Sequence, residues 1–336
     1  MTDKPKISVI LPFFNAEKTI ERAIQSIASQ SFLDFECILI DNNSTDNSNS
    51  IANSFAKQDR RFKVITETKQ GVMFASNAGW EASKGQYIAR MDADDWSHPD
   101  RLAMQNEFLD NNSDYEVVTT QVNHISHSEY TGGMARFVEW SNAIISYEEI
   151  LNNQFIEMPV VNPTAMWRRE TAEQNGMYLH GEFPEDYEMW LRWLNAGVKI
   201  KKLESKLLDW YDSDDRLSRT DPIYSDSAFY NIKTKYLAKW LEKHNPFHPN
   251  VAVWGASRIS RKRAKLLEAY GIIICCYIDT KKNRQLDHTV YYYQDIPSPN
   301  KIFVLTYIKQ KEAREEIREF LPKKGFIEGE NFMLVS

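Results

Sequence analysis

The chain has 336 residues, of which 42% are hydrophobic and 26% are charged. This is the composition of an ordinary globular protein, and the length predicts two domains. The net charge of −6 provides no basic surface for a nucleic acid, so no nucleic-acid partner is expected. The three cysteines lack the spacing of a zinc site. The adjacent Cys275 and Cys276 are expected to be buried free thiols in a reducing compartment.

The hydrophobic segments do not indicate a membrane protein. Residues 1–6 are short and largely polar and contain no signal-peptide core. No uninterrupted apolar run reaches the roughly 20 residues that a bilayer span requires. We therefore expect a cytoplasmic protein with no transmembrane segment. Peripheral contact with the inner face of the membrane, through Trp and Lys side chains, stays open.

Apolar runs and helical periodicity alternate over residues 1–95. The predicted order is strand 6–12, helix 16–30, strand 35–40, a helix capped by Ser44 or Thr45, strand 62–65, helix 71–82 and strand 87–91. This alternation predicts a parallel sheet covered by helices, with right-handed crossovers. Asp41 and Asp92 each follow a strand of this sheet. Both are therefore expected at its carboxyl edge, where ligands bind in open α/β sheets.

The pattern over residues 97–249 is less regular. The predicted order is strand 117–122, a turn at Gly132-Gly133, helix 144–155, strand 160–167, helix 187–196, an acidic stretch over 207–222, helix 227–243 and a linker at 245–249. Pro163 assigns its strand to a sheet edge, because proline cannot donate to a ladder. Pro184 places Glu185 and Asp186 in the first turn of the helix that follows.

After the linker, the alternation of strands and helices returns. Strands are predicted at 251–254, 272–278, 301–305 and 332–335, and helices at 261–270 and 311–321. This pattern predicts a small three-layer α/β domain of nucleotide-binding type. The predicted division is a first domain over 1–220, a helical linker over 221–249 and a second domain over 250–336.

A degenerate glycine-rich turn opens this second domain. It comprises Gly255, Ala256 and Ser257, with Ser260 where a third glycine is usual. Asp279 lies near the spacing expected of a ribose-binding acid in dinucleotide folds. A bound nucleotide and a structural or partner-binding role are both open for this domain.

The stretch from Tyr87 to Trp96 begins as an apolar run and ends in three carboxylates, Asp92, Asp94 and Asp95. Hard divalent cations take carboxylate oxygens and often keep substrate phosphates as further ligands. One interpretation is an Asp-Ala-Asp clamp that holds a divalent cation on a diphosphate. The other is an acidic, solvated loop that caps a helix starting near Pro99.

Five sequence blocks occur in order, and together they resemble glycosyltransferase family 2, whose members have the GT-A fold. They are Ser8–Glu17, Asp41–Asp46, Ala75–Gly79, Met91–Asp95 and Glu185–Tyr187. The resemblance covers residues 1–220. It implies an α/β fold in which a mostly parallel sheet binds a nucleotide-sugar. The second domain resembles a Rossmann-like tail found in some bacterial members.

The resemblance also implies residue roles. Asp186 would be the general base, and Asp94 with Asp92 would hold Mn²⁺ or Mg²⁺. The nucleotide-sugar would contact Pro12, Phe13, Asn15, Glu17, Asp41, Ser44, Arg90, Asp92 and Ala93. Asp186 should stay ionised, because the dipole of its helix favours an anion at the first turn.

The implied activity is metal-dependent, inverting transfer of a sugar from a nucleotide-sugar, most simply UDP-linked. The acceptor would be a hydroxyl of a glycan or lipid-linked molecule in bacterial surface polysaccharide synthesis. Leu191-Arg192-Trp193 lies inside the helix of Asp186 and is interpreted as core packing, which indicates an enzyme that adds single sugars.

The sequence departs from the family pattern at two positions. Asn42-Asn43-Ser44 replaces the usual Asp-Gly-Ser, and Ser76 stands where an arginine is common. The positive charge near the phosphates would then come from Lys69, Arg90, Arg216 or Arg219. Two rival functions are a non-catalytic nucleotide-sugar-binding or scaffold protein, and a nicotinamide-dependent redox module built on the second domain.

Overall fold

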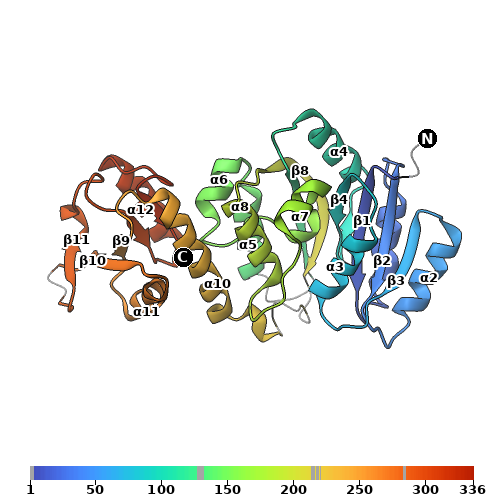
Figure 1. Ribbon diagram of the computed structural model, residues 1–336, viewed down its shortest axis with the longest axis horizontal. Helices are drawn as coiled ribbons and strands as arrows, with labels where there is room; N and C mark the ends of the chain where they lie inside the picture. Colours follow the sequence, from blue (N-terminus) through green and yellow to red (C-terminus); the bar gives the residue numbers. More distant parts are fainter. Residues whose placement is uncertain (1–3, 127–131, 213–215, 217–218, 220, 283–284) are drawn as a thin grey trace. The chain divides into compact units, whose positions relative to one another are not determined.

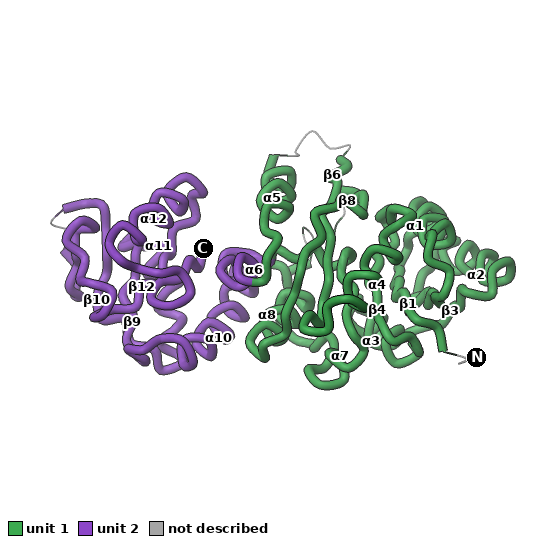
Figure 2. The backbone as a smooth tube through the Cα atoms, turned by 90° about the horizontal axis from the view of Figure 1, so that it is seen from above, with its two compact units in different colours: residues 1–147, 159–224 green, residues 148–158, 225–336 purple. Residues whose placement is uncertain are grey.

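The computed structural model describes residues 4–126, 132–212, 216, 219, 221–282 and 285–336. The chain divides into two compact units (Figure 2). Unit 1 comprises residues 1–147 and 159–224, and unit 2 comprises residues 148–158 and 225–336. The domain division expected from the sequence, into residues 1–220, 221–249 and 250–336, stays a prediction.

Unit 1 is built on an eight-stranded sheet with the order β3-β2-β1-β4-β7-β6-β8-β5. Its strands are β1 (Ile7–Phe13), β2 (Phe35–Asp41), β3 (Phe62–Thr66), β4 (Tyr87–Arg90), β5 (Trp96–Ser97), β6 (Val117–Ser126), β7 (Met166–Arg168) and β8 (Ile200–Asp212). The first four neighbours, β3-β2-β1-β4, are all parallel, as predicted. β7 runs antiparallel to β4 and β6, and β5 runs antiparallel to β8, so the sheet is mixed.

The helices of unit 1 connect and cover these strands (Figure 1). They are α1 (Ile20–Ala28), α2 (Ser48–Gln58), α3 (Val72–Ala82), α4 (Arg101–Asn111), α5 (Gly132–Asn142), α7 (Arg169–Asn175) and α8 (Glu185–Asn195), with short 3-10 helices η1 (Asn162–Thr164) and η2 (Pro222–Tyr224). In α1 the apolar residues recur at helical spacing, and the fully buried ones form the face that packs on the core.

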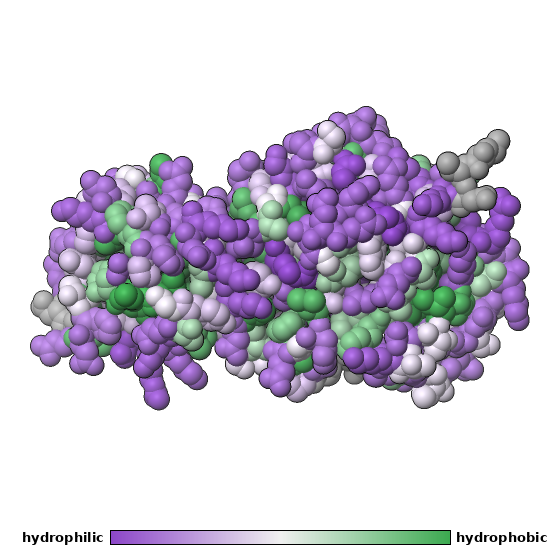
Figure 3. Space-filling view, in the orientation of Figure 1, coloured by the Kyte–Doolittle hydropathy of each residue, from purple (hydrophilic) through white to green (hydrophobic). Residues whose placement is uncertain are grey.

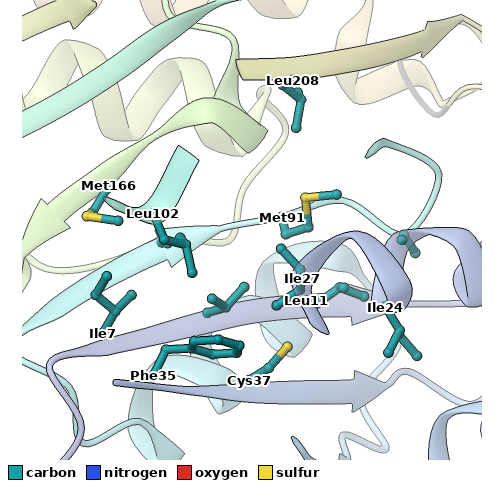
Figure 4. Close-up of a cluster of buried hydrophobic side chains, with 14 of the residues drawn as sticks. Ile7, Leu11, Ile24, Ile27, Phe35, Cys37, Met91, Leu102, Met166 and Leu208 are labelled. Carbon is teal, nitrogen blue, oxygen red and sulfur yellow. The ribbon is translucent and has the colours of Figure 1, made fainter. Parts of the chain in front are cut away.

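The core of unit 1 lies along the first strands of the sheet (Figure 4). All seven residues of β1 and of β2 are buried, as expected of central strands covered on both faces. Leu11 and Cys37 from these strands lie near Ile27 of α1 in the close-up. Met91, directly after β4, belongs to the same cluster, so the start of the acidic stretch is held by the core.

The predicted edge strand at 160–167 is wrong. Pro163 lies in η1, and the strand that follows, β7, pairs with both β4 and β6 inside the sheet. Proline is accommodated because it precedes the strand, at a position where no backbone N–H is needed for hydrogen bonding between strands. Gly132-Gly133 is also not a turn, since both residues belong to the first turn of α5.

The acidic stretch was expected to begin at residue 207, but residues 207–212 are the last part of the long strand β8. Its charged residues obscure the strand pattern in the sequence, and segments outside the sheet supply partners for one of them. Lys202 is fully buried, and its ammonium group donates to Ser141 Oγ (3.0 Å) and to Pro159 O (2.7 Å). The predicted cap of α2 also differs, since Asp46 Oδ1 accepts from the Ser48 N–H (3.0 Å).

Unit 2 contains a five-stranded parallel sheet with the order β11-β10-β9-β12-β13. Its elements are α6 (Tyr147–Asn153, which starts one residue inside unit 1), α10 (Asp226–His244), β9 (Asn250–Trp254), α11 (Arg258–Ala264), η3 (Lys265–Tyr270), β10 (Ile273–Asp279), β11 (Thr289–Tyr292), η4 (Tyr293–Asp295), β12 (Val304–Thr306), α12 (Lys311–Lys323) and β13 (Phe332–Leu334). The predicted α/β character of this unit is confirmed, with β11 as the strand that the sequence analysis missed.

The surface shown in Figure 3 is largely hydrophilic, with hydrophobic residues exposed in scattered places. Large hydrophobic side chains with substantial exposure are Phe14, Leu33, Leu179, Ile259, Tyr270, Ile273 and Ile327. Within the described residues, no helix is both long and apolar enough to cross a bilayer.

Candidate active site

The acidic stretch forms a compact cluster after β4. Asp92, Asp94 and Asp95 each offer a carboxylate oxygen, and these oxygens lie within 4.8 Å of one another. Asp92 and Asp94 are half-buried, whereas Asp95 is 1% exposed. The interpretation as a solvated loop is therefore wrong for Asp95. The cluster lies at the carboxyl edge of the parallel strands, because β4 pairs in parallel with β1 and ends at Arg90.

The guanidinium group of Arg90 lies under this cluster. It is 3% exposed and forms a salt bridge with Asp92 (2.6 Å). It also donates to the backbone oxygens of Ile10 (3.4 Å) and Met91. Burial is the largest single effect and opposes the charge, but the interactions with Asp92, Tyr178 and Glu185 together outweigh it and raise the pKa of Arg90. The sequence analysis assigned Arg90 to the nucleotide-sugar. In the structure its guanidinium group instead binds Asp92 and backbone oxygens of its own unit.

A second arginine, Arg101 at the start of α4, is fully buried behind the loop. Its Nη2 donates to Arg90 O (2.6 Å) and its Nε donates to Gln105 Oε1 (3.1 Å). Burial lowers the pKa of Arg101 to about 10. The nearby Asp95 and Asp92 carboxylates act in the opposite direction and favour the charged form. Arg101 was not predicted, because its helix gave no sign that its first residue faces inward.

The carboxylates themselves are electrostatically strained. Burial and then the charge of Asp92 raise the pKa of Asp94. Burial and then the charges of Asp94 and Asp92 raise the pKa of Asp95 well above its usual value. Asp95 Oδ1 accepts from the Tyr211 N–H (3.0 Å). Its buried Oδ2 has no hydrogen-bond partner within the described part of the chain.

These residues fit a divalent cation. Three convergent carboxylates, one with an unpartnered buried oxygen, form an all-oxygen donor set of the kind that Mg²⁺ and Mn²⁺ prefer. A cation would also relieve the mutual repulsion that raises the pKa values of Asp94 and Asp95. Asp94 and Asp92 were the predicted ligands. The structure adds Asp95, which the sequence shows as the next carboxylate in the same run.

Asp186 lies in the first turn of α8, as predicted, and is half-buried. Its Oδ1 accepts from the Tyr187 N–H (2.7 Å). Burial is the largest effect and raises the pKa of Asp186, the hydrogen bond to the Tyr187 N–H lowers it, and the charge of Asp92 adds to the rise. The expectation that Asp186 stays ionised remains a prediction. Asp92 repels the Asp186 carboxylate, so Asp186 lies within electrostatic range of the acidic cluster, although the two residues are far apart in sequence.

The neighbouring Glu185 is 6% exposed. Tyr224 donates its hydroxyl hydrogen to Glu185 Oε2 (2.8 Å). Burial, with the charge of Asp186 second, raises the pKa of Glu185 to about 8. Glu185 is thus not an ordinary exposed first-turn acid.

Tyr178 connects this helix region to the acidic cluster. It is buried and interacts with the guanidinium group of Arg90, which is also within electrostatic range of Glu185. The side chain of Asn77, on α3, donates to Tyr178 O (2.9 Å) and accepts from its N–H (3.2 Å). Arg90 therefore interacts both with the acidic cluster, through Asp92, and with the residues around α8, through Tyr178 and Glu185.

The predicted base-binding residues gather where β1 and β2 end. Phe13 and Asp41 are register partners, so the two strands end side by side. Asp41 is 5% exposed, and its two oxygens accept from the Ser44 N–H (3.0 Å) and from Asn49 Nδ2 (2.7 Å). Ser44 Oγ in turn accepts from the Asn15 N–H (3.1 Å). Asp41 thus holds the loop in place. Each oxygen of its carboxylate accepts one of these hydrogen bonds and has a further lone pair that can accept another.

The loop before α1 is exposed and tied to the loop before α2. Asn15 Oδ1 accepts from the Thr45 N–H (2.8 Å), and Glu17 Oε2 accepts from the Asn47 N–H (3.1 Å). Pro12 is buried at the end of β1, and Ala93 is 9% exposed between the two metal-ligand candidates. The predicted residues 12–17, 41–44 and 90–94 therefore lie on three adjacent parallel strands and their following loops.

The two departures from the family pattern have local explanations. Asn43 has a φ of 65°, which asparagine tolerates better than most residues with a side chain, and its Nδ2 donates to Thr68 O (2.8 Å). Ser76 is 1% exposed, because it lies on the buried face of α3. Leu191 and Trp193 are fully buried, which confirms that the Leu-Arg-Trp segment is core packing.

Two of the expected positive groups, Arg90 and Arg216, lie near the acidic cluster, and an arginine that was not predicted joins them. Arg22 of α1, which was not predicted, stacks over the Tyr211 ring (3.5 Å to the centroid) and donates to Asp94 O. Arg216 lies over the Trp210 ring (4.1 Å), and its charge lowers the pKa of Asp94. Lys69 is exposed, with its ammonium group over the Phe74 ring (3.8 Å). No motif distinguishes Arg22, since its role depends on α1 packing beside β5.

A cavity of about 530 Å³ lies beside β6 and α5 in unit 1. Its walls are mixed in character and are formed by Val122, Asn123, His124, Ile125, Ala135, Val138, Glu139, Asn142 and Lys206. His124 is the register partner of Trp210, and the next residue of β8, Tyr211, donates to Asp95. One strand therefore separates the cavity wall from the acidic cluster.

The glycine-rich turn of unit 2 is closed by its own side chains. Ser257 Oγ accepts from the Ser260 N–H (3.1 Å), and Ser260 Oγ donates to Tyr307 O (2.8 Å). A side chain at Gly255 would meet Ser260 Oγ at 3.0 Å, so Ser260 fills the space beside the turn. Asp279 is buried, and its Oδ1 accepts from the Lys281 N–H (2.8 Å). The described geometry thus offers little support for a nucleotide at this turn.

Comparison with known proteins agrees with the site in unit 1. The family described as Glycosyl transferase family 2 matches residues 8–176. The uncharacterized glycosyltransferase MJ1057 of Methanocaldococcus jannaschii is 29% identical over 259 residues, covering 75% of this chain and 85% of that protein. The protein EpsE of Bacillus subtilis, named as a glycosyltransferase, is 30% identical over 230 residues, covering 67% of this chain and 80% of that protein. An uncharacterized glycosyltransferase of Haemophilus influenzae is 36% identical over 158 residues, covering 47% of this chain and 62% of that protein.

Solved structures show the same fold. The crystal structure of residues 1–349 of S. aureus TarS in complex with UDP-GlcNAc superposes with a TM-score of 0.57 at 18% identity, covering 79% of this chain and 71% of that one. A structure of the same TarS fragment reaches 0.51 at 20% identity, covering 70% and 72%. The fold is that of the GT-A glycosyltransferases, and by the match across half of its length the chain belongs to glycosyltransferase family 2.

Proposed function

We propose that this protein is a divalent-metal-dependent glycosyltransferase that moves a sugar from a UDP-linked donor to an acceptor hydroxyl. The observation that supports the proposal is the electrostatic proximity of two groups in unit 1. One is the acidic cluster of Asp92, Asp94 and Asp95, and the other is Asp186, whose pKa is raised in part by Asp92. Family membership supplies the class of reaction.

The donor would span the ends of the first parallel strands. Asp41 and the tied loops around Asn15 and Ser44 would hold the nucleoside, with the Asp41 carboxylate accepting from the uracil N–H. A related fold in TarS holds UDP-GlcNAc, so such a donor suits this architecture. The diphosphate would then reach the acidic cluster, which lies past the end of β4 on the same edge.

Asp92, Asp94 and Asp95 would hold Mn²⁺ or Mg²⁺. The bound cation would neutralise the charge that develops on the nucleoside diphosphate as it leaves. The chain's own contribution is to keep these carboxylates together despite their repulsion. Arg90 pairs with Asp92 (2.6 Å), and Arg101 fixes the backbone at Arg90 O (2.6 Å).

Asp186 would act as the general base. It would accept the proton of the acceptor hydroxyl while the hydroxyl oxygen attacks the anomeric carbon and the bond to the diphosphate breaks. A raised pKa suits this role, because a base is most effective when its pKa approaches the working pH. A single displacement of this kind inverts the anomeric configuration. We further propose a glycan or lipid-linked acceptor in surface polysaccharide synthesis, with one sugar added per encounter.

The test is calorimetric titration with UDP, with GDP as the comparison, in the presence and absence of Mn²⁺. We expect Mn²⁺-dependent UDP binding in the wild type that is lost in Asp94→Ala. Asp209→Ala is a matched control, because Asp209 is an aspartate on β8 that lies outside the cluster and binds Asn123 (2.8 Å). Metal-independent binding that Asp94→Ala leaves unchanged would overturn the metal assignment.

The base is tested separately with a panel of UDP-sugars. Asp186→Asn should bind UDP and Mn²⁺ as the wild type does, while its turnover of the accepted donor falls by about 10²–10⁴-fold. The anomeric configuration of the product, read by NMR, tests inversion. If neither nucleotide binds, a scaffold role or a different nucleotide becomes the better explanation. If a bound UDP-sugar is never consumed, a non-catalytic nucleotide-sugar-binding role does.

A further inference from the structure

The sulfur atoms of two adjacent cysteines in unit 2, Cys275 and Cys276, lie close together. Successive residues of a regular strand point to opposite faces. In β10, however, the register with β9 shifts, because Ile274 pairs with Val251 and Cys276 pairs with the next residue, Ala252. Cys275 is the extra residue of this β-bulge. The consequence is that the Sγ atoms of Cys275 and Cys276 lie only 3.7 Å apart.

The two thiols differ in their surroundings. Cys275 is exposed, which corrects the expectation that both are buried, whereas Cys276 is 4% exposed in the core of unit 2. The hydrogen bond from Cys276 lowers the pKa of Cys275 to about 7. The same contact, with burial second, raises the pKa of Cys276. An accessible thiolate therefore has a buried thiol as its immediate neighbour.

We propose that Cys275 and Cys276 form an oxidation site, at which a hydroperoxide converts the two thiols into a disulfide between adjacent residues. The Cys275 thiolate attacks the terminal peroxide oxygen and the O–O bond breaks. Cys275 becomes a sulfenic acid, and the leaving hydroxide (from hydrogen peroxide) or alkoxide (from an organic hydroperoxide) takes up a proton from solvent. Cys276 then attacks the Cys275 sulfur and loses its proton. The S–O bond breaks, and the hydroxyl group leaves as water. The sulfurs lose two electrons in total, and the peroxide gains them.

The bulge makes the second step feasible. Closing the S–S bond to about 2.05 Å requires the sulfurs to approach by roughly 1.7 Å. Cys275 has no register partner in β9 or β11, so its backbone can adjust without breaking a ladder pair. Oxidation of Cys275 also removes the negative charge that disfavours the Cys276 thiolate. Adjacent Cα atoms are about 3.8 Å apart, shorter than usual for a disulfide, so the bond would be strained and readily reduced.

The test is peroxide treatment of the folded full-length chain, followed by alkylation, trypsin digestion and mass spectrometry. We expect the peptide Leu266–Lys281 to lose two hydrogens and escape alkylation, and dithiothreitol to restore both thiols. Cys37 is the internal control, because it is fully buried and burial raises its pKa. It should stay reduced and react with the alkylating reagent only after unfolding.

Two variants separate the steps. In Cys276→Ser, the sulfenic acid at Cys275 should persist and react with dimedone. In Cys275→Ser, Cys276 should stay reduced at the same peroxide concentration. The proposal is wrong if the wild-type peptide keeps its hydrogens, if Cys37 is oxidised as fast as the pair, or if dimedone fails to label Cys276→Ser. None of these readouts depends on the proposed glycosyltransferase activity.

Discussion

At the scale of single residues, Glu185 couples the proposed site to pH. It is 6% exposed, accepts from the Tyr224 hydroxyl, and has a pKa raised from 4.5 to about 8 by burial and by Asp186. Because the folded pKa exceeds the unfolded one, the folded state holds a proton that the unfolded state releases between these two values. The free energy of unfolding should therefore fall as pH rises through this window.

Glu185→Gln should remove this dependence, since the amide is never charged and its oxygen can still accept from Tyr224. Relative to the wild type, we expect little change in stability near pH ~4.5, and a gain on the order of 1–3 kcal/mol above pH ~8. Urea unfolding at three pH values measures the difference. Glu182→Gln, at an exposed position three residues earlier, is the control. Parallel pH profiles of Glu185→Gln and the wild type would contradict the prediction.

At the scale of an element, α3 must approach the sheet closely to support the site. It packs against β1 and β2 and carries Asn77, which holds Tyr178 at both backbone groups. A Cβ atom at Gly79 would lie 2.7 Å from both Ile10 Cγ2 and Ile40 Cδ1, closer than side chains tolerate. The glycine therefore sets the distance between α3 and the strands whose ends form the site.

Gly79→Ala should destabilise unit 1 by about 1–3 kcal/mol, because overpacking outweighs the better helix propensity of alanine. Gly133→Ala in α5 is the matched control, since nothing lies within 4 Å of the added methyl group. That substitution should be neutral or stabilising by up to about 1 kcal/mol. Chemical unfolding of both variants decides the point, and equal effects of the same sign would refute the packing argument.

At the scale of the whole molecule, the two units have different expected responses to the donor. The acidic cluster, Asp186 and the base-binding loops all belong to unit 1, whereas the closed glycine-rich turn belongs to unit 2. A ligand stabilises the state that binds it by mass action, and it slows hydrogen exchange where local opening would release it.

With UDP and Mn²⁺ at ten times the dissociation constant, we expect roughly tenfold slower amide exchange at residues 41–48 and 90–97. Residues 250–279 of unit 2 should exchange as in the free protein. NAD(H) without UDP should change neither region, and Asp94→Ala should lose the donor-dependent protection. Protection by NAD(H) confined to residues 250–279 would instead support the nicotinamide-dependent rival.

Local patterns in the sequence were sufficient for the first half of unit 1. Buried apolar runs alternate with amphipathic helices, and right-handed parallel connections bring the ends of such strands to one edge. The positions of Asp41 and Asp92 on that edge follow from this rule, and the order of the family blocks identified the glycosyltransferase family. These inferences succeed because they depend on residues that are neighbours in the chain.

Only the tertiary structure decided what surrounds those carboxylates. The charged strand β8 forms because β5 and β6 pair with it, and it brings the Tyr211 N–H to Asp95. The sequence analysis assigned Arg90 to the nucleotide-sugar and gave Arg101 no role, whereas the structure buries both guanidinium groups beneath the cluster. Burial is the largest cause of the raised pKa values of Glu185 and Asp186, and for Asp186 the distant Asp92 adds to it. Burial and charge coupling arise from such long-range contacts, which no local pattern records.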